Sequence, residues 1–203
     1  MIFFETGDHA ANGFERDPFK AIVAPRPIGW ISTRSKAGDI NLAPYSFFNA
    51  VASNPPIVMF SSDGQKDTLT FARQTGVFAA NYASHAQFDA MNASSAPLAR
   101  GQSEFAHAGL ESAPCSLIDV PYVVGAPAVL ECKVTQIVQQ QTVDGVNMDA
   151  WTVFGQVIGI RIDEAFVTDG CFDVEKAQPL SRLGYLDYSV VREVFAVGRP
   201  SNS

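Results

Sequence analysis

The sequence predicts a mainly β fold with short helices, arranged as a predominantly antiparallel barrel. Three observations favour this class: side chains alternate in type along several segments, Gly, Pro and Asn clusters separate these segments, and an Asp144-Gly145 turn signal lies between two long strand-like runs. The chain has 203 residues, 47% hydrophobic and 17% charged, enough to bury a substantial core. We expect one domain over 1–203, with an N-terminal extension over about 1–20 and a C-terminal tail over about 176–203.

The first half of the chain contains most of the predicted strands. Residues 28–33 indicate a strand entered through Pro25-Arg26-Pro27, and a turn at 36–39 makes it one arm of a hairpin. Residues 45–53 predict a single strand, in which Ser46 and Asn49 would lie on opposite faces. If both touch one ligand, the strand must bulge or one residue must act through its backbone.

After a Pro-Pro break, the apolar run 57–60 predicts a central strand covered on both sides. Lys66-Asp67-Thr68 then opens a predicted helix that ends at Gly76, with Asp67 or Thr68 as N-cap. Another strand is expected over Val77 to Tyr82, and a capping-box pattern at 84–87 precedes a second short helix.

The second half begins with a long irregular excursion over 94–126, rich in Ser, Ala, Gly and Pro. A loop of this length is usually functional or packed against a partner subunit. Residues 129–134 and 151–162 then predict a long antiparallel hairpin. In its first strand Cys132 falls in the apolar register and Glu131 in the polar one.

The overall charge excludes several classes of function. A net charge of −7 and a pI near 4.8 argue against a nucleic-acid surface, so any phosphate site must be local. Three cysteines without metal-ligand spacing fit free thiols in a reducing compartment, and no apolar run is long enough to span a bilayer. We expect a cytoplasmic protein with no metal site.

A polar cluster after the apolar run has the residue types of a phosphate site. Hydroxyls and a cation are supplied within eight residues by Ser61, Ser62, Lys66 and Thr68. The start of the predicted helix adds backbone N–H groups. The Asp67 carboxylate would repel a phosphate unless it caps the helix or is offset by Lys66 and Arg26. A solvated loop with an ordinary N-cap explains the same residues, and the cluster alone favours that simpler interpretation.

The segment Tyr45-Ser46-Phe47-Phe48-Asn49 offers an apolar wall with a hydroxyl and an amide, which suits a planar heterocycle with ring carbonyls and nitrogens. A core strand with a buried polar pair is the alternative, and composition alone favours it. Trp30 is open to the same two interpretations, as a barrel-core side chain or as one that stacks on a ligand ring.

Five pieces taken in order resemble the flavin reductase-like family of FMN-binding split barrels. They are RPIGWIST, NLAPYSFFNAVASNPPIVMFS, KDT followed by a helix, AMNASSAP, and PLSRLG with a later Tyr. The match runs from about Arg26 to about Tyr188. The resemblance implies a homodimeric split β-barrel that binds FMN near the dimer interface, with reduction of flavin by NADH or NADPH in many members.

The resemblance also implies site residues. Ser46 to Asn49 would line the isoalloxazine ring, and Ser61, Lys66 and Thr68 would hold the phosphate with Arg26 as a further candidate. Arg182 and Tyr188 match family positions in the tail, serving either their own subunit's flavin or the partner's. The complete predicted cofactor-binding set is Arg26, Trp30, Ser46, Phe47, Phe48, Asn49, Ser61, Ser62, Lys66, Asp67, Thr68 and Arg182.

The function implied is an FMN-dependent NAD(P)H oxidoreductase of the flavin reductase type, in which flavin N5 accepts hydride from the nicotinamide. That step requires no protein acid or base, so no catalytic residue is predicted. The alternative is an FMN-binding electron carrier reduced by a protein partner; an oxidase of the pyridoxamine-phosphate type fits the blocks less well. Predicted partners are a second copy of the chain and a small-molecule or flavin acceptor, including a monooxygenase or an electron-transfer protein.

Overall fold

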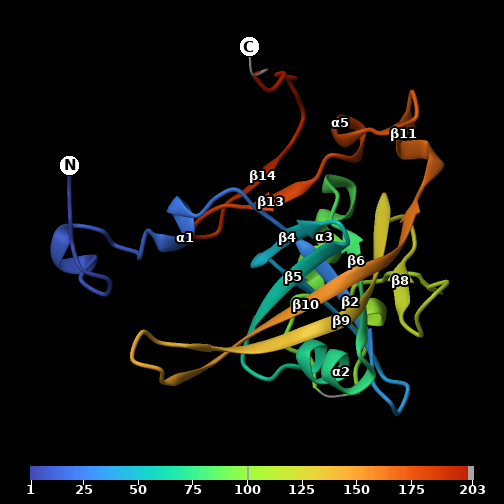
Figure 1. Cartoon of the computed structure of the whole chain (residues 1–203), viewed down its shortest axis with the longest axis horizontal. Coiled ribbons are helices and arrows are strands. Elements are labelled where there is room, and N and C mark those ends of the chain that lie inside the picture. Colours follow the sequence, from blue (N-terminus) through green and yellow to red (C-terminus); the bar gives the residue numbers. More distant parts are fainter. Residues whose placement is uncertain (100, 201–203) are drawn as a thin grey trace.

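A computed structural model describes residues 1–99 and 101–200, and its central feature is a curled antiparallel sheet (Figure 1). The strands of this sheet are β2 (Gly29–Arg34), β3 (Ile40–Tyr45), β4 (Phe48–Ser53), β5 (Pro56–Asp63), β6 (Val77–Tyr82), β9 (Ala128–Gln141) and β10 (Asn147–Ile162). They pair in the order β3-β2-β6-β9-β10-β5-β4, and every pair is antiparallel. The predicted mainly β, antiparallel fold is confirmed.

Short elements surround this sheet. The smaller strands are β1 (Arg26–Pro27), β7 (Ser112–Pro114), β8 (Pro121–Val123), β11 (Val167–Thr168), β12 (Cys171–Phe172), β13 (Leu180–Arg182) and β14 (Tyr188–Val190). The α-helices are α1 (Phe19–Ile22), α2 (Asp67–Thr75), α3 (Phe88–Ala93), α4 (Glu104–His107) and α5 (Val174–Ala177). Single 3-10 turns are η1 (Ala10–Asn12), η2 (His85–Gln87) and η3 (Glu164–Phe166). Strands β1, β13 and β14 form a small sheet that ties the tail to the start of the barrel.

A two-residue bend at Ser46 and Phe47 joins the two edges of the large sheet. The single strand predicted over 45–53 is therefore wrong, because β3 ends at Tyr45 on one edge and β4 begins at Phe48 on the other. The Tyr45 ring packs at 5.0 Å from the Phe60 ring, and Ser61 N–H donates to the Phe47 carbonyl at 2.8 Å. These contacts close the barrel, and they also remove the register conflict between Ser46 and Asn49.

Strand β5 was expected to be covered on both faces, and within this chain that expectation is wrong. Val58, Phe60 and Ser62 are buried, whereas the alternate residues Ile57 and Met59 are only half-buried. The neighbouring edge strand β4 is exposed from Asn49 to Ser53. The chain therefore leaves one face of its β4–β5 edge open.

The buried residues form two clusters, one inside the barrel and one outside it. The inner cluster contains Phe60 and Phe78, and Gly155 is required beside Phe78 because a Cβ there would lie 2.4 Å from that ring. The outer cluster contains Trp30, which is fully buried and donates from Nε1 to the Ser94 hydroxyl at 2.9 Å. Trp30 is thus a core residue, held by one buried polar partner.

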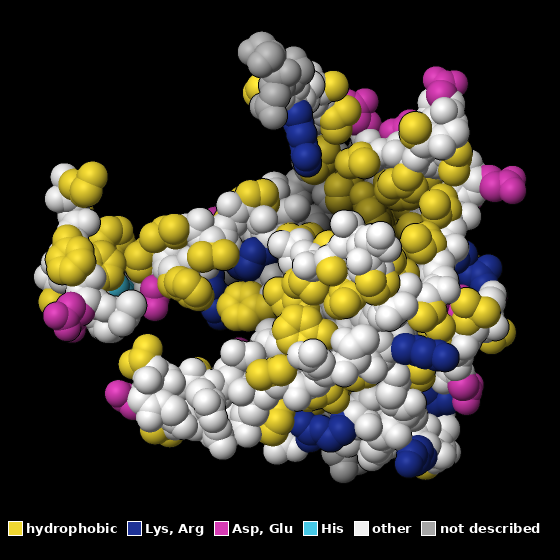
Figure 2. Space-filling model, viewed as in Figure 1, with side chains coloured by type: hydrophobic (Ala, Val, Ile, Leu, Met, Phe, Trp, Pro, Cys, Tyr) yellow, Lys and Arg dark blue, Asp and Glu magenta, His cyan; other side chains and the backbone are white. Residues whose placement is uncertain are grey.

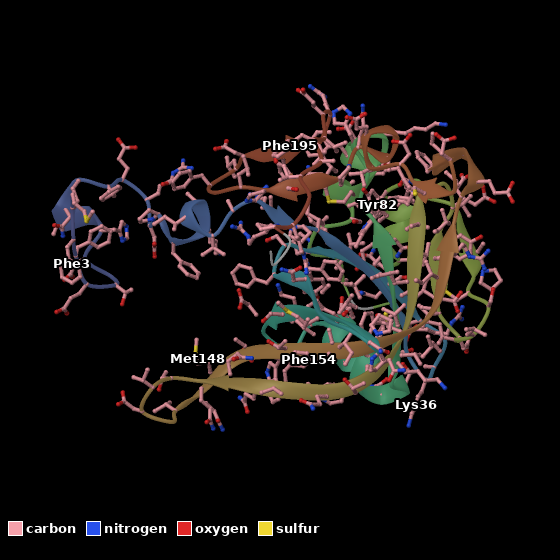
Figure 3. All side chains as sticks on the ribbon, turned by 45° about the horizontal axis from the view of Figure 1, so that its top comes forward. Phe3, Lys36, Tyr82, Met148, Phe154 and Phe195 are labelled. Atoms are coloured by element: carbon pink, nitrogen blue, oxygen red, sulfur yellow. The ribbon has the colours of Figure 1, made fainter. Side chains whose placement is uncertain are left out.

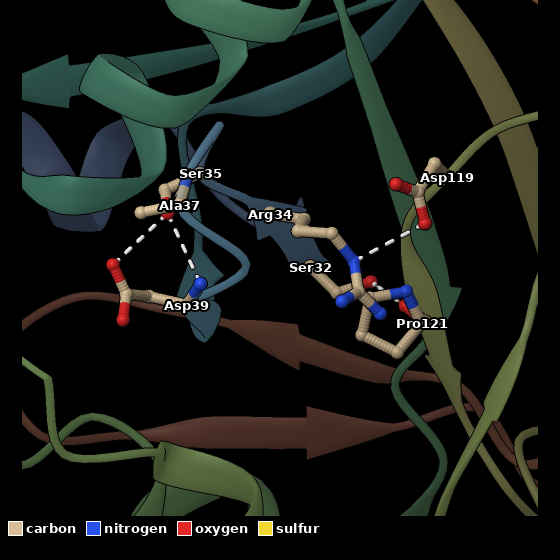
Figure 4. Close-up of polar contacts among 7 residues, drawn as sticks. All are labelled: Ser32, Arg34, Ser35, Ala37, Asp39, Asp119 and Pro121. Carbon is tan, nitrogen blue, oxygen red and sulfur yellow. Dashed lines mark hydrogen bonds and ion pairs between the residues drawn. The ribbon is translucent and has the colours of Figure 1, made fainter.

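Both predicted hairpins are present. In the turn between β2 and β3, the Ser35 hydroxyl accepts from Ala37 N–H and Asp39 N–H, and Arg34 beside it pairs with Asp119 at 3.3 Å (Figure 4). The β9–β10 hairpin is longer than predicted and extends well beyond the barrel (Figure 1). Its turn contains Gly145 at φ +78°, a backbone conformation that favours glycine.

The excursion over 94–126 folds back on the barrel through α4 and the β7–β8 pair. It covers Glu131, which the alternation of its strand placed on the polar face but which is only 3% exposed. Both carboxylate oxygens of Glu131 are used, accepting from Ser116 N–H at 2.9 Å and Leu117 N–H at 2.7 Å. Burial of Glu131 is therefore compensated by backbone donors that come from the excursion.

The N-terminal segment projects from the barrel and carries exposed hydrophobic side chains (Figure 2). Phe3 is 87% exposed, while Phe4 packs on Phe14 with ring centroids 5.4 Å apart. Among the described residues, no helix combines the length and the hydrophobicity needed to cross a membrane.

Candidate functional site

A cavity of about 640 Å³ lies between the Ser46-Phe47 bend and the start of α2. Its walls bring together segments far apart in sequence: the bend, the β5–α2 connection, the 94–98 segment and α1. Of the predicted site residues, this cavity is lined by Ser46, Phe47, Ser61, Lys66, Asp67 and Thr68. The volume lies in the range of sites for drug-sized ligands.

The N-terminus of α2 opens into this cavity without a side-chain cap. Helix α2 spans nine residues and ends at Gly76 (φ +72°), as predicted, but its N-cap is Lys66, whose side chain makes no capping hydrogen bond. The predicted capping role of Asp67 or Thr68 is therefore wrong. The first N–H groups of any helix lack partners inside it, so a helix start of this kind presents donors and a positive dipole to an anion.

Hydroxyl groups surround the same helix end. Thr68 is 1% exposed, and its Oγ1 accepts from Asn41 Nδ2 at 2.7 Å, which leaves the hydroxyl proton free to donate. The Ser61 hydroxyl donates to the Trp151 carbonyl at 3.2 Å. Ser62, in contrast, is fully buried, donates to the Gly64 carbonyl at 3.0 Å and does not line the cavity.

Two titratable groups inside the cavity are perturbed. The Tyr45 hydroxyl is buried close to Thr68 and Ser62 but has no hydrogen-bond partner of normal geometry, and burial raises its pKa. Burial also raises the pKa of Glu104, and the nearby Asp67 charge raises it further. Backbone N–H donors lower it in part, and one of them is Leu42 N–H at 3.1 Å from Glu104 Oε2. Neither residue was singled out as perturbed from the sequence.

The predicted phosphate candidate Arg26 does not line this cavity. Its guanidinium donates to the Lys20 and Val23 carbonyls of the α1 region and to the Leu183 carbonyl at 2.7 Å. Arg26 is 7% exposed, and burial lowers its pKa, with Arg182 as a second cause. The residue pins α1 and the tail against β1.

A cation that sequence reasoning missed is Lys20, on α1. Lys20 lines the cavity, and its Nζ lies 5.8 Å from the centroid of the Phe47 ring. The Arg26 guanidinium lies 5.9 Å from the same centroid. No pattern around Lys20 marked it, because α1 is a single turn preceded by the irregular N-terminal segment.

Several predicted residues lie elsewhere. Phe48 and Asn49 border an adjoining hollow beside Arg26 and Met59. Phe48 also borders an apolar cavity of about 330 Å³ at the barrel mouth, near the hydrophobic hollow visible above β10 in Figure 2. Arg182 lies over the Tyr188 ring at 4.3 Å and donates to the Tyr185 carbonyl, away from the main cavity. Trp30 is in the outer core, as described above.

The segment from Ser94 to Leu98 forms a wall of the cavity that the predicted residue set omitted. A signal for it existed, since AMNASSAP was one of the blocks that resemble the flavin reductase-like family. Glu104, further along the same excursion, had no such signal. Within the described residues, no group of three or more His, Cys, Asp or Glu is arranged to hold a metal ion.

The fold and cavity define a class, that of antiparallel split barrels with a cavity of mixed polar and apolar lining beside a helix start. The family model described as the flavin reductase like domain matches residues 23–179. The chain belongs to the flavin reductase-like family, which assigns it a flavin-related function.

Individual relatives and solved structures are similar to this chain over most of its length. An uncharacterised protein of Halalkalibacterium halodurans is 34% identical over 186 residues, 89% of this chain and 88% of its own. The solved structure of nitrilotriacetate monooxygenase component B from Bacillus cereus superposes with a TM-score of 0.86 at 27% identity, covering 97% of this chain and 98% of that one. The 2-nitrobenzoate 2-nitroreductase of Pseudomonas fluorescens superposes with a TM-score of 0.79, also at 27% identity, with 90% and 88% covered.

Proposed function

We propose that the chain is an FMN-dependent NAD(P)H oxidoreductase of the flavin reductase type. The observation that carries the proposal is the single cavity that joins the aromatic bend at Ser46 and Phe47 to the uncapped start of α2. One end suits a planar aromatic ring and the other suits a phosphate, which are the two ends of FMN.

At the phosphate end, the proposed partners are the N–H groups of the first turn of α2, the Thr68 hydroxyl and the Lys66 ammonium. Asn41 already donates to Thr68 Oγ1, so this oxygen is held in place before a ligand arrives and its proton is available to the phosphate. Ser61 lies on the preceding strand, and its hydroxyl would have to turn from the Trp151 carbonyl to donate to the phosphate. Asp67 and Glu104 work against an anion here, so FMN binding is expected to favour the protonated form of Glu104.

At the ring end, the proposed wall consists of the Tyr45–Phe47 segment and the facing 94–98 segment.

When bound, FMN supplies the hydride acceptor for the nicotinamide. The residues of this chain are required only to bind and orient the two molecules, because hydride transfer between them needs no protein acid or base. For this reason no side chain of this chain is proposed as a catalytic residue.

We further propose a homodimer. The exposed β4 edge and the projecting β9–β10 hairpin favour an interface, since Val51 is 49% exposed and Met148, labelled on the hairpin in Figure 3, is 45% exposed. The similarity to a monooxygenase component supports a partner enzyme that receives reduced flavin. The single domain over 1–203 and a cytoplasmic location stay predictions.

The test is to purify the full chain, measure FMN binding and record flavin bleaching with NADH and with NADPH under anaerobic conditions. The expected result is one FMN per chain and bleaching by at least one nucleotide. Bound FMN that only a protein donor reduces would favour the electron-carrier alternative. A chain that binds no FMN would refute both.

A further inference from the structure

Lys20 is the feature of the cavity that the proposed FMN contacts leave without a role. It comes from α1, outside the barrel, and its side chain is exposed at the rim of the cavity beside the Phe47 ring. The phosphate contacts proposed above lie at the start of α2 on a different wall and already include the cation Lys66.

The position of Lys20 is built into the fold. The Lys20 carbonyl accepts from the Arg26 guanidinium, which also holds the Val23 carbonyl and, across the small sheet, the Leu183 carbonyl. Arg26 is 7% exposed. A buried cation with three backbone acceptors therefore fixes a one-turn helix that could not be stable alone, and this helix presents Lys20 to the cavity.

The acidic character of the chain favours a cation at the cavity rim where a second anionic ligand approaches. The chain carries a net charge of −7, and the cavity wall includes Asp63, Asp67 and Glu104 against only Lys20 and Lys66 among the described lining residues. An anion that approaches an occupied phosphate site would meet the charge of that phosphate and the Asp63 carboxylate, and a positive charge on its path would offset this repulsion.

We propose that Lys20 attracts and orients the phosphates of the nicotinamide dinucleotide at the cavity rim. This inference rests on the proposed function and deepens it, because it separates the residues that hold the resident cofactor from one that selects the transient co-substrate. Because Lys20 acts through its charge at an exposed position, it should affect how readily the nucleotide binds, measured as KM, and salt should screen this effect.

The experiment uses the FMN-loaded full chain and three variants, Lys20→Met, Lys20→Arg and Lys36→Met. Lys36 is a matched exposed lysine in the β2–β3 turn, at the opposite end of the molecule from the N-terminal segment (Figure 3). For each protein, KM and kcat for NADH and NADPH are measured at low and high ionic strength, together with the Kd for FMN.

For Lys20→Met we expect the KM for the nucleotide to rise roughly three- to fivefold at low salt, the size of one exposed ion pair. The kcat and the FMN Kd should stay at the wild-type values, the difference should disappear at high salt, and Lys20→Arg should restore the wild-type KM. Lys36→Met should match wild type throughout.

Two results would overturn the inference while leaving the proposed function intact. They are an unchanged KM for Lys20→Met, and a weakened FMN Kd with an unchanged KM, which would assign Lys20 to the cofactor phosphate. A wild-type protein that oxidises neither nucleotide would refute the proposed function itself, and the inference with it, before any variant is compared.

Discussion

Replacing Lys66 by alanine tests the phosphate end of the cavity most directly. Lys66 is the N-cap of α2 and is exposed, so the substitution leaves packing unchanged. A hydrogen bond to a charged group contributes about 1.5–3 kcal/mol, and the exposure of Lys66 places the loss at the lower end of that range. A loss of about 1.5 kcal/mol corresponds to a roughly tenfold higher Kd for FMN.

The assay is fluorescence titration of FMN and of riboflavin, which carries the same ring without the phosphate. Lys66→Ala should weaken FMN binding about tenfold and leave riboflavin binding nearly unchanged. Lys20→Ala provides the contrast, because it should alter neither affinity. An equal loss for both flavins would show that Lys66 does not contact the phosphate.

Three further predictions concern buried groups. Burial raises the pKa of Glu104, so the ionised form is disfavoured in the folded chain. The free energy of unfolding of wild type should therefore fall relative to that of Glu104→Gln as the pH rises from about 4 to about 7. Urea titrations that show a constant difference between the two proteins would contradict this. Glu131→Gln should lower the free energy of unfolding by about 1–3 kcal/mol, since one of two backbone donors loses its acceptor; an unchanged urea midpoint would refute the buried role. Cys171 is exposed, whereas burial raises the pKa of Cys115 and Cys132 to about 12, so a thiol reagent at about pH 8 should label Cys171 alone until the chain unfolds.

Local patterns predicted the elements but not the way the sheet closes. The Gly76 stop, the strand over Val77 to Tyr82 and both hairpins follow from turn chemistry and alternation, and all are present. The bend at Ser46 and Phe47 could not be predicted in this way, because it depends on Tyr45 packing against Phe60 from a later strand. Alternation continues across the bend, so the sequence resembles one strand where the fold has two.

The candidate site shows the same contrast between residues that local sequence patterns predicted and residues that only tertiary packing brings together. The contiguous cluster at the start of α2 was found because its members are neighbours in sequence, as Ser61, Lys66 and Thr68 are. Arg26 was a further phosphate candidate through the resemblance, whereas in the fold its guanidinium donates to three carbonyls. Lys20 and Glu104 reach the cavity only through tertiary packing, which no spacing rule reports.

The Ser46-Phe47 bend also links the ligand to the cooperativity of the fold. Strands β3 and β4 occupy the two ends of the strand order, yet a single dipeptide joins them. A molecule bound against that dipeptide would contact the connection between both edges, so its binding free energy would stabilise β3 and β4 together against local unfolding. Amide hydrogens of β3 and β4 should therefore gain exchange protection together when FMN is added, although the two strands are not hydrogen-bonded to each other.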